Sequence, residues 1–350
     1  MIRHVARRTF TRTIRRTAVA ILGFTAGCDA QGPLSPGDGS PPPEETGHVT
    51  SAASLLVGAR IWQNPDSPAR RQADAWRASR PSDATLMERI ASQPIAQWIG
   101  GWTGDVRNHV RGIVSRAAND GTVPVFVAYN IPNRDCGGYS ASGAQSTAAG
   151  YRSWIREVAA GLSGGRAVVV LEPDAVAQMS CLNAQGQEER LALLRDAVEL
   201  LKEAGAAVYV DAGNARWVAA AEMAARLKRA AIDRADGFSL NVSNFIGTSA
   251  NLAYGEAISA RLSGKHFIID TSRNGMGGSS DGQWCNPPGQ ALGQAPTTRT
   301  GHRLVDAYLW IKYPGESDGP CNGGPAAGSW WPDYALGLAQ RQAAVLASRS

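Results

Sequence analysis

A regular alternation of apolar, strand-like runs with helix-period segments is the feature that most limits the fold of this chain. Seven runs have this character, and they read IAQWIGG, VPVFVAYN, RAVVVLEPD, AAVYVDAG, GFSLNVSN, KHFIIDTSRNG and DAYLWIKYPG. A less certain eighth, SLLVGARI, precedes them at 54–61. Segments with apolar residues at helical spacing lie between most of the runs, such as 146–162 and 186–205. Strands that alternate with helices predict a parallel sheet built from βα units.

The number of units favours a barrel over an open sheet. A single α/β barrel can reach 350 residues, and no GxGxxG motif follows the early strands. We therefore predict a distorted, TIM-like parallel α/β barrel of seven or eight strands, with an open doubly wound sheet as the alternative. Barrel enzymes place their active sites at the C-terminal ends of the strands. Candidate site residues are thus expected where each apolar run stops.

The first 27 residues have the pattern of an export signal. Residues 1–16 contain six arginines and no acid, and the apolar run TAVAILGFTAG that follows has 11 residues. A membrane span needs about 17 to 25 residues, so the run fits a signal peptide instead. Arg7, Arg8 and Phe10 resemble a twin-arginine signal, whereas the pair Arg15 and Arg16 would serve general secretion. Both export routes remain open.

Cys28 follows small residues, as in a bacterial lipobox, so we expect it to be acylated; a plain cleaved signal with a stray thiol is the alternative. Residues 28–50 are rich in proline, glycine and acid, which predicts an extended tether. The folded domain is expected at 51–350. We expect an exported protein, either a cell-surface lipoprotein or secreted, that touches the membrane only through the lipid.

Charge and cysteine content limit the possible partners. The net charge of +5 comes from the basic N-terminal segment, and no Lys/Arg cluster with interleaved aromatics follows. We therefore expect no nucleic-acid partner. The four cysteines after Cys28 predict two disulfides in an oxidising compartment, and the absence of CxxC argues against structural zinc. Three pairings are possible, of which we prefer the sequential one, Cys136 with Cys181 and Cys285 with Cys321.

The residues at the strand ends are mostly carboxylates with neutral polar partners. They are Tyr129, Asp135, Asp174, Asp211, Asn241, Asn244, Asp270, Arg273, Lys312, Glu316 and Asp318. Histidine is rare, and the sequence has no GxSxG, HExxH or Walker motif, which excludes serine-histidine, zinc-hydrolytic and phosphoryl-transfer chemistry. We expect no cofactor and no metal. A mechanism based only on carboxylates fits glycoside hydrolysis, which uses two of them.

Tryptophans also gather near the strand ends, as a sugar-binding cleft requires. They are Trp62, Trp98, Trp102, Trp217, Trp284 and Trp310. Any one of them alone would be interpreted as a core residue. Their joint placement beside the acids favours a carbohydrate substrate.

Seven separate motifs together resemble glycoside hydrolase family 6, the inverting cellulases built on a distorted α/β barrel. They read YNIPNRDCGGYS, LEPD, YVDAGNARW, NVSN, IIDTSRNG, WCNPPGQALG and WIKYPGESDG, and the resemblance covers about residues 52–345. It implies hydrolysis of β-1,4-glucosidic bonds in cellulose or a related β-glucan, with inversion and without a cofactor. We expect a monomer.

The resemblance implies a role for each catalytic candidate. Asp174 matches the general acid, and Asp135 matches a second aspartate that raises the pKa of the acid through like-charge proximity. Asp318 matches the aspartate usually proposed as the base, acting on water directly or through a water chain. Tyr129 matches the tyrosine beneath the sugar at the cleaved bond.

The remaining candidates match positions that bind or support the substrate. Lys312 and Glu316 match residues that grip glucose units on the non-reducing side. Subsite-lining or supporting positions are matched by Trp98, Trp217, Trp284, Asp211 and Asn244. The alternative for Asp211, and for Asp270, is that each caps a helix or pairs with an arginine such as Arg273. The two disulfides of the family are matched by Cys136–Cys181 and Cys285–Cys321.

Two departures from the family pattern concern the position of the catalytic water. Asn214 stands where many relatives have histidine, and Ala141 stands where some have serine, with Ser140 and Ser142 on either side.

Short loops predict the mode of attack. In the family that the chain resembles, chain-end enzymes roof the cleft with two long loops, one soon after the acid and one near the final disulfide. The segments that follow Asp174 and Asp318 here are too short for such a roof. The resemblance therefore implies an open cleft and an endoglucanase, with a chain-end cellobiohydrolase as the alternative. A lipid-anchored glucan-binding protein without turnover would keep the tryptophans and lose the acids. Asp135, Asp174 and Asp318 are all present, which favours an enzyme.

Overall fold

The computed structural model describes residues 53–278 and 282–348. The chain divides into two units, Met1–His48 and Val49–Ser350, and the description below concerns the second. The predicted export signal, the tether and Cys28 lie outside the described residues. Within the described ranges, no helix combines the length and the apolar character needed to cross a membrane.

A seven-stranded parallel sheet forms the centre of the domain, and each strand pairs with the next one along the chain. The strands are β1 (Gln97–Ile99), β2 (Val125–Ala128), β3 (Val168–Leu171), β4 (Ala207–Asp211), β5 (Gly237–Leu240), β6 (His266–Asp270) and β7 (Val305–Leu309). The sheet curls until a parallel bridge between Ile95 and Trp310 joins its two edges just outside β1 and β7. This topology confirms the predicted distorted barrel with seven strands.

The eighth strand considered at 54–61 does not form. Residues Ala53–Leu56 make one helical turn, α1, and only Ile61 pairs with the barrel, through a parallel bridge to Val123. Gly58 has φ +71°, a left-handed conformation that a strand cannot contain. The apolar run therefore turns at Gly58 instead of extending.

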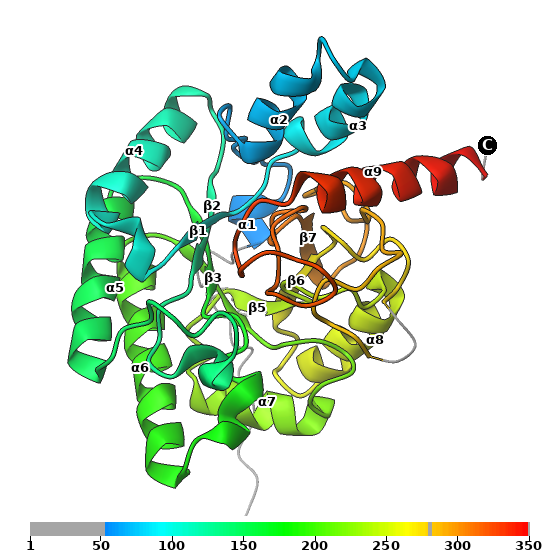
Figure 1. Ribbon diagram of the computed structural model, residues 1–350. Helices are drawn as coiled ribbons and strands as arrows, with labels where there is room; N and C mark the ends of the chain where they lie inside the picture. The colour runs from blue at the N-terminus through cyan, green and yellow to red at the C-terminus, as the bar shows by residue number, and fades with distance from the viewer. Residues whose placement is uncertain (1–52, 279–281, 349–350) are drawn as a thin grey trace, which may run out of the picture. The chain divides into compact units, whose positions relative to one another are not determined.

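Helices cover the outside of the strands (Figure 1). Those that follow β1 to β5 are α4 (Val106–Asn119), α5 (Ala148–Leu162), α6 (Ala184–Glu203), α7 (Ala220–Arg229) and α8 (Thr248–Ser259). Before the barrel lie α2 (Pro68–Trp76) and α3 (Pro81–Ala91), and α9 (Pro332–Ala347) follows β7. Short 3₁₀ turns are η1 (Gly101–Thr103), η2 (Arg134–Gly137) and η3 (Ala177–Cys181). Side-chain caps fix two helix starts, because Thr147 accepts the N–H of Gly150 and Asn183 that of Gly186.

The strands are apolar on both faces because both faces are buried. In β2, Val125 and Val127 belong to the cluster inside the barrel, whereas Phe126 and Ala128 pack against the helices. Strand β3 alternates in the same way. This double burial explains why the strands were recognisable as continuous apolar runs. Most of the predicted site residues follow the strands, at the C-terminal edge of the sheet.

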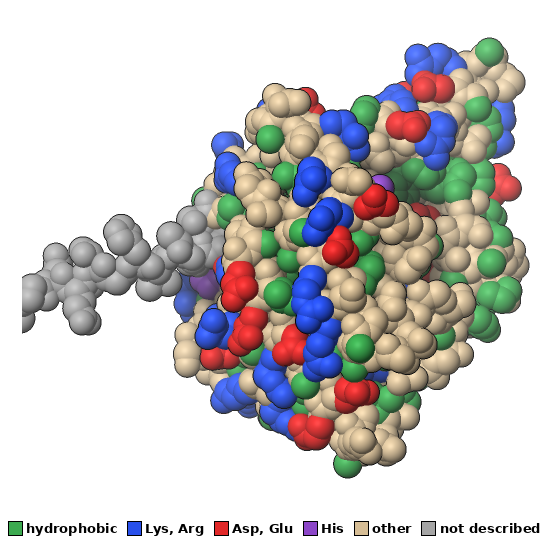
Figure 2. All heavy atoms as spheres, turned by 90° about the vertical axis from the view of Figure 1, so that its left-hand side faces the viewer, with side chains coloured by type: hydrophobic (Ala, Val, Ile, Leu, Met, Phe, Trp, Pro, Cys, Tyr) green, Lys and Arg blue, Asp and Glu red, His purple; other side chains and the backbone are tan. Residues whose placement is uncertain are grey.

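The outer face of α4, α5 and α6 carries mixed charges (Figure 2). Arg107 pairs with Glu157 at 2.9 Å, and Arg152 pairs with Asp196 at 2.6 Å. Basic and acidic side chains thus alternate over the described residues of this face.

Candidate active site

A cavity of about 460 Å³ opens at the C-terminal ends of the strands. Of the predicted site residues, it brings together Trp98, Tyr129, Asp135, Asp174, Trp217, Asn244, Trp284, Lys312 and Asp318. Asp211 and Glu316 are not among the lining residues. The parallel register places these side chains together, because the residues that follow paired strands emerge at the same edge.

The loop after β2 carries Tyr129 and Asp135. The Tyr129 ring stands edge-on to Trp98, with centroids 5.4 Å apart. Buried Arg134 donates hydrogen bonds to the carbonyls of Tyr129, Ser140 and Ser142, and its guanidinium lies 4.5 Å from the Tyr129 ring centre. Asp135 Oδ2 accepts the N–H of Ser140 at 2.7 Å. Arg134 therefore fixes the loop that presents Asp135 to the cavity.

Asp174, three residues after β3 ends at Leu171, has the chemistry of a general acid. Enclosure by protein raises the pKa of its carboxyl well above the usual value, and the negative charges of Asp211, Asp135 and Asp318 raise it further, in that order. Burial is therefore a larger cause than the like-charge proximity of Asp135 expected from the sequence. A carboxyl with a raised pKa keeps its proton near neutral pH and can donate it.

Asp211 lies beneath Asp174 rather than in the cavity wall. It is fully buried, and its Oδ1 accepts the N–H groups of Asp174 and Gly213, both at 3.0 Å. The Ser239 hydroxyl donates to its other oxygen at 3.1 Å. Burial raises the pKa of Asp211 to about 7. Of the two roles expected for Asp211, this position favours the supporting one.

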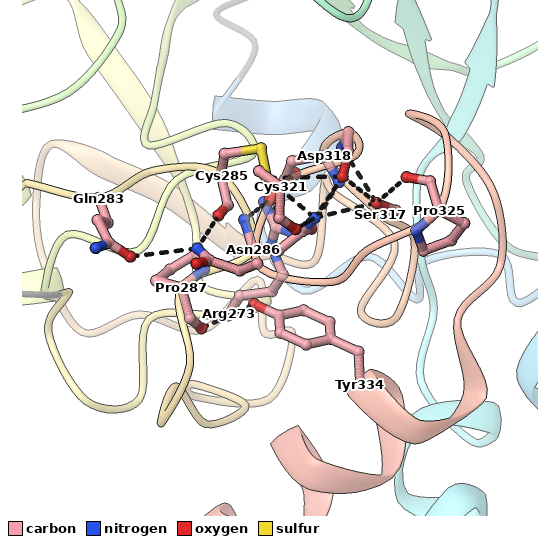
Figure 3. The surroundings of a disulfide bond; sticks show 12 residues. Arg273, Gln283, Cys285, Asn286, Pro287, Ser317, Asp318, Cys321, Pro325 and Tyr334 are labelled. Atoms are coloured by element: carbon pink, nitrogen blue, oxygen red, sulfur yellow. Dashed lines mark hydrogen bonds and ion pairs between the residues drawn. A yellow bond between two sulfur atoms is a disulfide. The ribbon is translucent and has the colours of Figure 1, made fainter.

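Asp318 lines the cavity with both carboxylate oxygens already engaged (Figure 3). The fully buried Arg273 approaches them at 2.9 and 3.0 Å, and the Asn286 N–H donates to Oδ2 at 3.0 Å. The Asn286 side chain in turn accepts the N–H of Asp318 and donates to the carbonyls of Gly319 and Cys321. Arg273 and Asn286 therefore hold the carboxylate of Asp318 in one position at the cavity wall.

Tryptophans line two sides of the cavity. Trp98 is held by its indole N–H, which donates to the Ile311 carbonyl at 2.8 Å, and Lys312 Nζ lies 5.5 Å from its ring centre. Lys312 also pairs with Glu316 at 3.2 Å, and Glu316, which does not line the cavity, thereby orients the lysine. Trp217 and Trp284 are 41% and 51% exposed, which leaves ring faces free for a sugar.

The other three tryptophans do not line the cavity. Trp62 and Trp310 are 3% and 2% exposed and belong to the core, so the expectation that they form part of a cleft is wrong. Trp102 is exposed but packs over Gly100, on the far side of Arg134 from Tyr129. Both buried tryptophans sit on segments that join barrel elements, where apolar packing decides their position.

Both disulfides form in the preferred pairing. Cys136 bonds to Cys181 and Cys285 to Cys321, with Cα–Cα distances of 6.0 and 6.1 Å. The first joins the residue after Asp135 to the end of the turn that follows Asp174. The first disulfide thus connects the loops that carry Asp135 and Asp174. The second connects the loop of Asp318 to the loop of its hydrogen-bond partner Asn286.

Some residues of the site had no sequence signal of their own, and Gln178 in the cavity wall is one of them. Ser140 and Asn214, which the departures from the family pattern had singled out, also line the cavity, whereas Ser142 is not among the lining residues. Arg273 and Asn286 act through Asp318 and were not predicted to do so. Asp270 is fully buried and accepts backbone N–H groups from three loops, without a direct place in the cavity wall.

Comparison with known proteins identifies the family. Residues 56–342 match the family model described as Glycosyl hydrolases family 6. The chain belongs to this family. Endoglucanase A of Cellulomonas fimi is 45% identical over 268 residues, which cover 76% of this chain and 58% of that protein. Endoglucanase 1 of Streptomyces halstedii is 43% identical over 301 residues, which cover 82% of this chain and 90% of that protein. The chain therefore spans less than two thirds of the Cellulomonas relative and most of the Streptomyces relative.

A solved family 6 structure shares the fold. It is the endoglucanase Cel6 from Mycobacterium tuberculosis in complex with methyl-cellobiosyl-4-deoxy-4-thio-β-D-cellobioside, with 43% identity and a TM-score of 0.78. The match covers 83% of this chain and 99% of that one. The seven-stranded barrel described above is thus the family 6 fold.

Proposed function

We propose that this protein hydrolyses internal β-1,4-glucosidic bonds of cellulose or a related β-glucan, with inversion at the anomeric carbon. The observation that carries the proposal is Asp174, a carboxyl with a raised pKa that lines a tryptophan-walled cavity together with Asp135 and Asp318. Relatives at 43% and 45% identity that are named endoglucanases support the same activity.

The first half of the reaction is protonation of the leaving oxygen by Asp174. Its raised pKa keeps the proton available, and the hydrogen bond from its backbone N–H to Asp211 holds the backbone at this position. Tyr129, held edge-on against Trp98, lies beside the same position in the cavity and would contact the sugar ring at the cleaved bond.

The second half is attack by water from the opposite face of the sugar. Because Arg273 and Asn286 already engage the oxygens of Asp318, we propose that Asp318 receives the proton of this water through a water chain rather than directly. Ser140 lines the cavity next to Asp135 and can hydrogen-bond to such a water. A base that acts through water requires carboxyls roughly 6.5 to 9.5 Å apart and leads to inversion.

The loops support internal cleavage. In the segment from Asp174 to Cys181, Asp174 and Gln178 are the described residues that line the cavity. None of the described residues after Asp318 lines it. Long roofing loops at these two places would enclose a chain end. Their shortness here leaves room for a glucan to enter along its length.

The experiment that tests the proposal measures the viscosity of carboxymethyl cellulose together with the release of reducing sugar. We expect viscosity to fall steeply while few reducing ends appear, and Asp174→Asn to abolish both changes. A slow fall in viscosity, with cellobiose dominant from the first minutes, would instead indicate a chain-end enzyme. Absence of reducing sugar from the wild-type protein would indicate a glucan-binding protein.

We also propose that a lipid on Cys28 anchors the exported protein at the cell surface. The small residues Thr25, Ala26 and Gly27 directly before this cysteine support the proposal. Cys28→Ala should move the protein from the membrane fraction to the soluble fraction of the producing cells. Retention of the variant in the membrane fraction would contradict the anchor.

A further inference from the structure

Glu172 is a buried carboxylate directly beside the candidate acid, yet it does not line the cavity. It is two residues before Asp174, it is fully buried, and its backbone has φ +48°. One carboxylate oxygen accepts the N–H of Asn130 at 3.1 Å, and the other accepts the N–H groups of Asn130 and Ile131 at 2.9 and 3.1 Å. These donors directly follow Tyr129. Glu172 therefore joins the end of β3 to the start of the loop that carries Asp135.

That loop has a strained backbone. Asn133, Asp135 and Cys136 have φ values of 56°, 53° and 48°, in the left-handed region that residues with a side chain rarely adopt. Such conformations cost free energy and persist only where the surroundings hold them. The position of Asp135 therefore depends on the groups that hold the loop.

Three buried charged side chains hold the backbone of this loop. Glu172 accepts its N–H groups, whereas Arg134 and Arg190 donate to its carbonyls. Arg190, which projects from α6, donates to the carbonyls of Pro132 and Asn133 at 3.3 and 2.7 Å. It also reaches the carbonyl of Ala175, next to Asp174, at 3.3 Å. Glu172 and Arg190 thus connect both sides of the site, the Asp135 loop and the Asp174 turn.

The charge of Glu172 matters as well as its shape. Burial raises its pKa to about 7, while the N–H groups of Ile131 and Asn130, the Tyr151 hydroxyl of α5 and the Arg134 charge favour the ionised form. The negative charge of Glu172 also favours the charged form of Arg190, whose pKa is lowered by burial. A neutral side chain of the same size would accept hydrogen bonds with one oxygen instead of two and would leave the two arginines without a counter-charge.

We infer that Glu172, supported by Arg190, is a positioning residue that sets where Asp135 and Tyr129 stand relative to Asp174. This inference rests on the proposed glucanase function. The loop it holds acts on the cleaved bond, whereas Trp217 and Trp284, which offer exposed ring faces to the sugar, lie on other loops. Loss of Glu172 should therefore lower kcat and leave KM almost unchanged.

The test compares Glu172→Gln with a matched control, Asp236→Asn. Asp236 is also a largely buried carboxylate that accepts a backbone N–H, from Val208 at 2.6 Å, and pairs with a cation, Lys202 at 2.6 Å. It precedes β5, at the end of the barrel opposite the cavity. The measurements are kcat and KM on a soluble cello-oligosaccharide, with the melting temperature of each variant.

We expect Glu172→Gln to lower kcat by about 10- to 100-fold with KM within about twofold of wild type, because displacement of a catalytic group by 1 Å can cost 10²-fold. Asp236→Asn should keep the wild-type kcat even if its melting temperature falls as much as that of Glu172→Gln. Equal kcat values for the two variants, or a rise in KM alone, would overturn the inference. An inactive wild-type protein would instead overturn the proposed function.

A second pair of variants decides the matter where Glu172→Gln does not fold. Arg190→Lys keeps the positive charge and loses the forked donors. Its control on the same helix is Arg195→Lys, because Arg195 donates to the carbonyl of Arg229, away from the Asp135 loop. We expect Arg190→Lys to lower kcat at constant KM and Arg195→Lys to leave both unchanged. Matching kcat values in this pair would likewise overturn the inference.

Discussion

The ion pair between Arg273 and Asp318 offers a sharp test of how the site is held together. The Arg273 side chain is completely buried and that of Asp318 is 6% exposed, with contacts of 2.9 and 3.0 Å between them. Arg273→Met would keep an apolar contact with the Phe245 ring, which lies 4.2 Å from the guanidinium carbon. It would leave Asp318 with the Asn286 N–H as the donor to its carboxylate.

The size of the effect follows from the burial of both partners. Removal of one member of a buried pair typically costs about 3–5 kcal/mol, because the other charge is left uncompensated. We expect this loss in the free energy of unfolding for Arg273→Met and for Asp318→Asn. The double variant has neither charge, so its loss should be smaller than the sum of the two single losses by about 2–3 kcal/mol.

Urea unfolding of the wild type, both single variants and the double variant measures this coupling. A large coupling would show that Arg273 and Asp318 stabilise the fold as one buried ion pair. Losses that add within about 0.5 kcal/mol would refute the reasoning, since independent sites behave in that way.

Three further predictions concern stability, pH and binding. Replacing Cys136 and Cys181 by serine should lower the free energy of unfolding by about 4 kcal/mol, because the disulfide closes a sequence separation of 45 residues; a loss below about 1 kcal/mol in urea unfolding would contradict this. Asp211→Asn removes the leading charge that raises the pKa of Asp174, so the acid loses its proton at lower pH. The alkaline limb of the kcat profile should then move to lower pH, and an unchanged limb would exclude this coupling. Trp217→Ala should raise KM for cello-oligosaccharides with little change in kcat, whereas a fall in kcat alone would argue against a binding role.

The barrel could be predicted because its strands are buried on both faces. Runs such as 125–128 and 168–171 are apolar throughout, and the polar residues that follow them meet at one edge. The prediction failed at 54–61, where hydrophobicity alone did not reveal the turn at Gly58. A short apolar run does not by itself distinguish a strand from a helical turn.

The site was predictable only in part, because burial and long-range pairing depend on the folded chain. Asp174 and Asp135 were found from their motifs, but the cause of the raised pKa of Asp174 needed the structure. The partners Arg273 and Asp318 are 45 residues apart in the sequence and meet through two loops. Glu172 is two residues before Asp174 in the same motif, and both residues have a positive φ angle. Their side chains nevertheless lie in different surroundings. Sequence spacing could not show that one lines the cavity and the other holds a loop.

The measurement that tests the central claim most directly is ¹H NMR of a fresh digest of cellohexaose. It reports in one experiment whether the protein hydrolyses a β-1,4-glucan, which bond it cuts and which anomer forms first. We predict cleavage of internal bonds, with the α-anomer at the new reducing end before mutarotation, because water attacks opposite the oxygen that Asp174 protonates. The β-anomer as the first product, or an intact hexasaccharide, would contradict the account.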